Sequence, residues 1–235
     1  DIIKGGLGAD IMSGEAGDDT FIFQRSDVDN DYIYGGDASA DSGIDTVDYS
    51  QSFNGMTIIL GDGNAQGTAI SADQGNDYLF GIENVIGSDT DVFSDIITGN
   101  NVKNIISGMA GNDTIYGAAG ADTIYGGAND DELHGGDDAD SIDGGAGNDK
   151  IYGDAAVDTL TGGAGNDTFF LGKDDGLDVI DGNDDSDTIN YSSIITGTPS
   201  TDGVVVTLNG STQTTVTING TDQDLITNIE NVVGT

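Results

Sequence analysis

Apolar residues in the middle of the chain recur once every nine positions, and most of them lie between two residues of more polar character. Such a residue predicts a three-residue strand whose middle side chain faces inward while its neighbours face outward. A fixed short period predicts a solenoid in which each unit packs against its neighbours. The inward positions, eighth in each unit, are Ile106, Ile115, Ile124, Leu133, Ile142, Ile151, Leu160 and Phe169.

A glycine opens each of these units, and further glycines follow it in most of them, which predicts a tight reversal between one short strand and the next. The opening glycines are Gly99, Gly108, Gly117, Gly126, Gly135, Gly144, Gly153 and Gly162. Because each reversal sends the next strand back along the opposite side, two units make one flattened coil of eighteen residues. We therefore predict an all-β fold, a parallel β-roll in which a unit stacks on the unit two places further along.

The period divides the chain into four segments. Residues 1–22 form a partial roll, and residues 99–170 form a central roll of eight units. Residues 23–98 and 171–235 break the period. Their β-branched runs, such as Thr57–Leu60, lie between Gly, Asn and Asp residues and predict short antiparallel hairpins that interrupt the roll.

A longer repeat overlies the short one. DDTFIF at Asp18 returns as NDTFFL at Asn166, 148 residues later, and DTVDYS at Asp45 returns as DTINYS at Asp187. A module of about 148 residues therefore repeats, and residues 171–235 begin its next copy. Asp1 holds the sixth position of a unit whose glycines are missing, so we expect the sequence to be a piece of a longer protein.

The sixth position of most units is an aspartate, and stacking of alternate units predicts two columns of them. One column is Asp113, Asp131, Asp149 and Asp167, and the other is Asn104, Asp122, Asp140 and Asp158. An ion between vertically adjacent turns would receive a carboxylate oxygen from each, together with backbone carbonyl oxygens. A shell of oxygen ligands alone favours Ca²⁺ over Mg²⁺, which keeps its waters and demands stricter geometry.

Composition supports metal sites. The chain carries 43 acidic and 5 basic residues, for a net charge of −38, and it contains no cysteine. The negative charge disfavours binding to nucleic acid, and the lack of a long apolar run disfavours insertion into a membrane. The acidic residues recur at fixed places between apolar ones, which favours oxygen-rich metal sites over disorder. We expect calcium to be required for folding, because the acidic chain repels itself without counter-ions.

Three units carry a family resemblance: GMAGNDTIY (108–116), GGAGNDKIY (144–152) and GGAGNDTFF (162–170). They resemble the RTX, or haemolysin-type, calcium-binding nonapeptide repeat, whose pattern is GGxGxDxUx. The resemblance implies a parallel β-roll with Ca²⁺ in its turns, about six ions in the central roll and one or two near the N-terminus. It also implies a large repetitive protein that a Gram-negative bacterium exports by type I secretion, and an extracellular or cell-surface location.

The resemblance assigns ligands residue by residue. The carboxylate ligands are Asp10, Asp19, Asp113, Asp122, Asp131, Asp140, Asp149, Asp158 and Asp167. The turn backbone that assists them is that of Gly108, Gly111, Gly117, Gly120, Gly126, Gly135, Gly144, Gly147, Gly162 and Gly165. Asp1 and Asn104 are expected to be weaker ligands, and Ala156, where glycine is usual, predicts a weaker site beside Asp158.

Two further groups are candidates for binding. Asp27, Asp29 and Asp31 read DxDxD, but Tyr32 stands where an EF-hand loop needs glycine, so an irregular calcium site is the alternative that stays open. Outward ninth positions of alternate units would form an aromatic ladder, either packing between strands or a surface for polysaccharide. That ladder is Tyr116, His134, Tyr152 and Phe170.

The sequence favours a structural, calcium-binding module of a secreted or cell-surface protein such as an adhesin. No HExxH, no GxSxG and no nucleophile with a nearby base is present, so we do not expect an enzyme. The alternatives are an accessory module of a secreted polysaccharide epimerase, lipase or protease, and a polysaccharide-binding module. The expected partners are neighbouring domains of a longer chain, with polysaccharide or the cell surface as further candidates.

Overall fold

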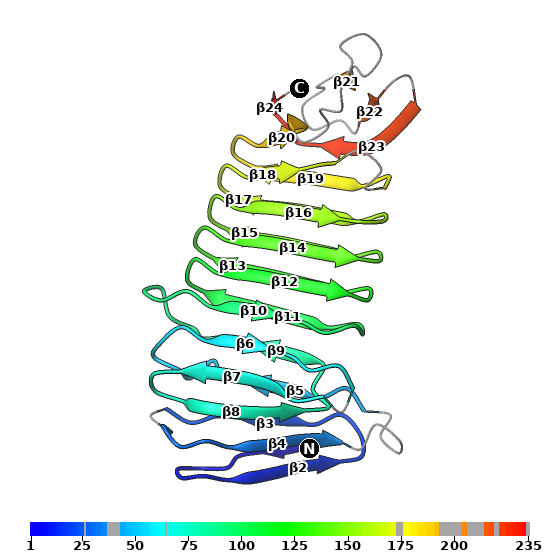
Figure 1. Cartoon of the computed structure of the whole chain (residues 1–235). Helices are drawn as coiled ribbons and strands as arrows, with labels where there is room; N and C mark the ends of the chain where they lie inside the picture. Colours follow the sequence, from blue (N-terminus) through cyan, green and yellow to red (C-terminus); the bar gives the residue numbers. More distant parts are fainter. Residues whose placement is uncertain are drawn as a thin grey trace.

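The computed structural model is an elongated stack of coils, with the N-terminal strands at one end and the C-terminal strands at the other (Figure 1). It describes residues 1–25, 27–36, 43–63, 65–172, 176–192, 204–205, 214–218 and 221–233. Within these ranges, two sheets of twelve strands each form the two sides of the stack. No helix in these ranges is long and apolar enough to cross a membrane.

Odd-numbered strands form most of one sheet, and even-numbered strands form most of the other, because each reversal carries the chain across. Sheet A contains, in spatial order, β1 (Ile2–Ile3), β3 (Thr20–Ile22), β5 (Thr46–Asp48), β9 (Asn84–Ile86), β11 (Ile105–Ala110), β13 (Thr123–Ala128), β15 (Ser141–Ala146), β17 (Thr159–Ala164), β19 (Val179–Asp184), β23 (Thr221–Thr227), β22 (Thr214–Ile218) and β21 (Val204–Val205). Sheet B contains β2 (Ile11–Glu15), β4 (Tyr32–Gly36), β8 (Gly75–Phe80), β7 (Gly67–Ser71), β6 (Thr57–Ile59), β10 (Ile96–Thr98), β12 (Thr114–Ala119), β14 (Glu132–Asp137), β16 (Lys150–Asp154), β18 (Thr168–Phe170), β20 (Thr188–Asn190) and β24 (Asn231–Val233).

The central strands pair in parallel with a register of eighteen residues. Ile124 of β13 lies opposite Ile142 of β15, and Leu133 of β14 lies opposite Ile151 of β16. Each unit therefore stacks on the unit two places further along, and the predicted all-β parallel roll is confirmed.

Antiparallel strands interrupt the roll at two places. Strand β7 pairs antiparallel with both β6 and β8, and β22 pairs antiparallel with β21 and β23. The hairpin expected at Thr57–Leu60 is thus confirmed. Parallel stacking nevertheless continues beyond the central roll, through β3, β5 and β9 at one end and β18, β20 and β24 at the other. Parts of 23–98 and 171–235 lie outside the described residues.

The core is a narrow file of side chains between the two sheets. All eight inward residues of the central roll are buried, and the file continues into the segments where the nine-residue period fails. There it includes Phe21, Ile33, Val47, Ile58, Leu79, Val85, Ile97, Ile180, Ile189 and Ile226 on the strands, and Tyr49 and Tyr191 directly after them. Because each strand of the central roll buries one large apolar side chain, the core there is thin, and the interactions in the turns must supply much of the stability.

Candidate metal centre

Two columns of acidic side chains run along the stack, one at each edge, where a strand begins. Within a column, the carboxylate of one coil accepts a hydrogen bond from the backbone N–H of the equivalent residue in the preceding coil. The distance is 2.7 Å from Asp113 N to Asp131 Oδ1 and 2.8 Å from Asp122 N to Asp140 Oδ1. Column A is Asp19, Asp45, Glu83, Asn104, Asp122, Asp140, Asp158, Asp178 and Asp224. Column B is Asp10, Asp31, Asp77 and then, after the inserted hairpin, Asp95, Asp113, Asp131, Asp149, Asp167, Asp187 and Glu230.

The second carboxylate oxygen, Oδ2, lies inside the turn and has a different environment. Within the described ranges, it is buried and accepts no hydrogen bond in Asp10, Asp19, Asp113, Asp122, Asp131, Asp140, Asp149, Asp167 and Asp187. A buried anionic oxygen without a partner is costly, and a cation is what would offset this cost. We call these the open oxygens.

The opening glycine of each unit makes room for the open oxygen. A Cβ added at Gly126 would lie 2.5 Å from Asp131 Oδ2 and 2.6 Å from the carbonyl oxygen of Gly144. The same conflict arises at Gly108, Gly117, Gly135, Gly144 and Gly162. The turn glycines have positive φ angles, which favour glycine, at Gly111, Gly120, Gly147 and Gly165. The glycine pattern therefore brings carboxylate and carbonyl oxygens of neighbouring coils close together.

Burial changes the protonation of the column carboxyl groups. Desolvation raises the pKa of Asp131 to about 8, and the charges of Asp113 and Asp149 add to the effect against a backbone hydrogen bond that lowers it. The same cause raises the pKa of Asp122 to about 7 and that of Asp140 to about 6. The calcium-free columns therefore resist ionisation at neutral pH. A divalent ion held by oxygen ligands would remove this resistance, and the donor set fits Ca²⁺.

The residues expected to bind weakly differ from the rest. The Asn104 amide is satisfied by protein: Oδ1 accepts from Asn100 N at 2.9 Å, and Nδ2 donates to the Glu83 carbonyl oxygen at 2.6 Å. The side chain of Asp1 is exposed, while its terminal amine pairs with Asp19 Oδ1 at 2.7 Å. Ala156 takes the left-handed φ of 95° that a glycine would adopt more easily.

Several column residues escaped the sequence prediction because they lie where the nine-residue spacing fails. They are Asp45, Asp77, Asp95, Asp178, Asp187 and Asp224, with Glu83 and Glu230. A local signal was available in all six aspartates: each lies two residues before a buried Val, Ile or Leu, as Asp45 does before Val47.

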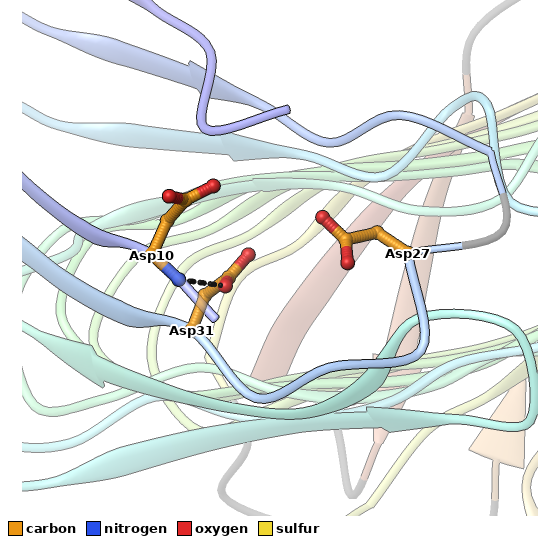
Figure 2. Close-up of side chains that lie close together, drawn as sticks. All are labelled: Asp10, Asp27 and Asp31. Atoms are coloured by element: carbon orange, nitrogen blue, oxygen red, sulfur yellow. Dashed lines mark hydrogen bonds between the residues drawn. The ribbon is translucent and has the colours of Figure 1, made fainter. Parts of the chain in front are cut away.

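An additional acidic group lies at the N-terminal end of column B. One carboxylate oxygen from each of Asp10, Asp27 and Asp31 lies within 4.8 Å of the others, and Figure 2 shows the three side chains around a common space. Gly8 N donates to Asp27 Oδ1 at 3.1 Å, and Asp10 N donates to Asp31 Oδ1 at 2.8 Å. Of the expected DxDxD residues, Asp27 and Asp31 join this group, together with Asp10, and Asp29 does not.

The aromatic ladder forms on the outer face of sheet B. Ring centroids are 4.8 Å apart for Tyr116 and His134, 4.2 Å for His134 and Tyr152, and 4.5 Å for Tyr152 and Phe170. The rings are nearly parallel, so each inner ring has both faces covered by its neighbours and presents only its edge to solvent. This geometry favours packing between strands over stacking on sugar rings.

The fold and the columns define the class of protein: a parallel β-solenoid with stacked, oxygen-lined turns suited to calcium. Comparison with known families matches residues 1–23, 98–133 and 134–169 to the RTX calcium-binding nonapeptide repeat (4 copies). These three segments of the chain therefore carry RTX calcium-binding nonapeptide repeats. Comparison with curated proteins found no match.

Proposed function

We propose that the chain is a structural module of a secreted or cell-surface bacterial protein, and that calcium folds it after export. The observation that carries the proposal is the pair of columns with open oxygens. Adjacent coils present these oxygens at equal steps along the stack, together with glycine carbonyl oxygens. An ion between two coils would bind both and join them.

The charge of the chain explains why the ion would control folding. The net charge is −38, and each column stacks ionisable carboxyl groups on one another inside the protein. Without a cation the stacked groups either repel each other or take up protons, and both cost stability near neutral pH. At low calcium, as in a bacterial cytosol, the chain would stay open for export by a type I system, and higher external calcium would fold it.

The Asp10, Asp27 and Asp31 group supports an ion near the N-terminus, as the family resemblance implies. Asp27 and Asp31 are buried, and burial together with the charges of Asp27, Asp10 and Asp29 raises the pKa of Asp31. Three carboxylates in one place fit a divalent cation and need one to ionise together.

A calcium titration tests the proposal. β-structure is followed by circular dichroism and bound ions are counted after dialysis, with Mg²⁺ as the competing ion. We expect calcium to raise the β signal and several ions to bind per chain. Asp131→Asn should lower the ion count, whereas Asp143→Asn, on the exposed face of β15, should not. Full β-structure in calcium-stripped protein at neutral pH, unchanged by calcium, would refute the proposal.

A further inference from the structure

Not every column carboxylate has an open oxygen. Asp77 Oδ2 accepts a hydrogen bond from the Tyr49 hydroxyl at 3.0 Å, and Asp224 Oδ2 accepts one from the Tyr191 hydroxyl at 2.8 Å. All four side chains are buried. Asp95 is also satisfied by protein, since Ser88 N donates to its Oδ2 at 2.7 Å. We call these the closed coils, as opposed to coils with open oxygens.

The two tyrosines occupy the place of the opening glycine. In the central roll, the opening glycine Gly117 follows the column residue Asp113 by four positions. Tyr49 follows the column residue Asp45 by the same four positions, and Tyr191 follows Asp187 likewise. A glycine there lets the next carboxylate fold against the backbone. A tyrosine instead fills that space with a ring, and its hydroxyl reaches the carboxylate on the next strand of the coil.

The tyrosine rings are held firmly in this place. Tyr49 stacks on Phe23, which also follows its strand directly, with centroids 4.2 Å apart and an angle of 14° between the planes. Tyr49 N donates to the Ile86 carbonyl oxygen at 2.9 Å, and Tyr191 N donates to the Val233 carbonyl oxygen at 2.9 Å. Ring packing and the backbone hydrogen bond therefore orient the hydroxyl group of Tyr49, and the backbone hydrogen bond together with full burial orients that of Tyr191.

We propose that Tyr49 and Tyr191 replace a calcium ion in their coils, so that the coils of Asp77 and Asp224 bind no calcium at these carboxylates and keep their structure without it. A hydroxyl proton satisfies the buried oxygen as a cation would, and the ring occupies the space next to it. This inference rests on the proposed function, because it assigns calcium dependence to some coils and not to others.

The closed coils lie beside the central roll. Asp95 in column B and Asn104 in column A, both satisfied by protein, directly precede Asp113 and Asp122, the first residues of the roll with open oxygens. At the other end, Asp224 follows Asp178 in column A. Calcium-independent coils would therefore border the calcium-dependent ones and offer a preformed sheet edge on which the roll can stack.

Hydrogen exchange read by mass spectrometry tests the inference on the whole chain, in calcium-stripped protein and after calcium addition. Without calcium, we expect protection of amides in the coil of Tyr49 and Asp77, including the Tyr49 N–H that donates to the Ile86 carbonyl oxygen, and free exchange through Asp113–Asp167. Calcium should then protect the central roll. Exchange that is equally fast in both regions without calcium would overturn the inference.

A tyrosine substitution separates the hydroxyl from the ring. Tyr49→Phe keeps the stacking on Phe23 and removes the donor to Asp77, and exchange around Asp77 should become on the order of 10- to 100-fold faster in stripped protein. Tyr125→Phe, at an exposed tyrosine of β13, is the matched control and should leave exchange unchanged. Equal effects of the two substitutions would contradict the role of the hydroxyl.

The bound-ion count supplies a second, independent measurement. Asp77→Asn should leave the number of bound calcium ions unchanged, and Asp131→Asn should lower it. A lower count for Asp77→Asn would show that this carboxylate binds calcium and would overturn the inference while leaving the proposed function intact. If the unsubstituted protein binds no calcium, the proposed function fails, and protection around Asp77 in stripped protein still decides whether the tyrosine closes its coil.

Discussion

Protons should substitute for calcium in this fold. In the folded, calcium-free chain, burial raises the pKa of Asp131 to about 8 and those of Asp113, Asp122 and Asp149 to about 7. An aspartate in the unfolded chain titrates near ~3.9. Between these values the folded state binds more protons than the unfolded state. The free energy of unfolding therefore rises as the pH falls through the folded pKa values, and it is lost as the pH rises through them.

The size of the effect follows from the shifts. A buried carboxyl group with a folded pKa near 7 gains about 2 kcal/mol of stability between pH 7 and pH 5, or about 1 kcal/mol if half is lost to screening. The four groups named above, all in the central roll, would together add roughly 4–8 kcal/mol, which is comparable to the whole stability of many small domains. Acidification from pH 7.5 to pH 5 should therefore fold much of the roll without calcium.

Circular dichroism of calcium-stripped protein between pH 8 and pH 5 measures this folding. Chelating resin is preferable to a soluble chelator, whose affinity for calcium changes over the same range. The protein stays above its pI of about 4.1 throughout, which limits precipitation. In calcium the dependence should reverse, because protons compete with the ion for the same oxygens. If the stripped protein gains no β-structure by pH 5, the burial argument for the columns is wrong.

Three further predictions address individual residues. Asp140→Ala should weaken two ion sites at once, because Asp140 Oδ1 accepts a hydrogen bond from Asp122 N and Asp140 N donates one to Asp158 Oδ1, so that Asp140 lies between two coils. If calorimetric titration shows the loss of only one ion, Asp140 is not shared by two sites. Gly126→Ala should lower calcium affinity, since the new Cβ would lie 2.5 Å from Asp131 Oδ2, whereas Ser141→Ala on the exposed face should bind calcium normally. Tyr152→Ala removes two ring contacts and should lower the free energy of unfolding of the calcium form by about 1–3 kcal/mol in urea, while the number of bound ions stays the same. If the variant instead loses binding to polysaccharide and keeps its stability, the ladder is a recognition surface.

The sequence predicted the roll well because its signals are local and repeated. The inward position of Ile124, the turn at Gly126 and the column place of Asp131 follow from one nine-residue pattern, and the coil of eighteen follows from chain reversal. The same reasoning placed Asn104 in its column and predicted that it differs from the aspartates, but it did not predict the Asn100 and Glu83 contacts that satisfy its amide.

The remaining features depend on contacts between residues that no period relates. Asp27 lies beside Asp10, where its Oδ1 accepts a hydrogen bond from Gly8 N, and no repeat spacing relates the two aspartates. Tyr49 and Asp77 are 28 residues apart with a hairpin between them, so no spacing predicted their hydrogen bond. The sequence around Asp45 nevertheless contained a usable signal. Asp45, the buried Val47 and Tyr49 have the spacing of the aspartate, the inward residue and the opening glycine in a regular unit, so they could have been assigned to the column although the nine-residue period fails there.

Stacking of alternate units also limits how such a chain can change length. Thr123 lies opposite Ser141, and Tyr116 lies opposite His134, each eighteen residues further on. A duplication or deletion of two units would add or remove one coil, a step of about 4.8 Å, and leave every later residue on its original side. A change of one unit would move all later strands to the opposite sheet, exchanging the two outer faces. The later strands, and any surface that they form, therefore stay on the same sheet only if an even number of units is inserted or deleted.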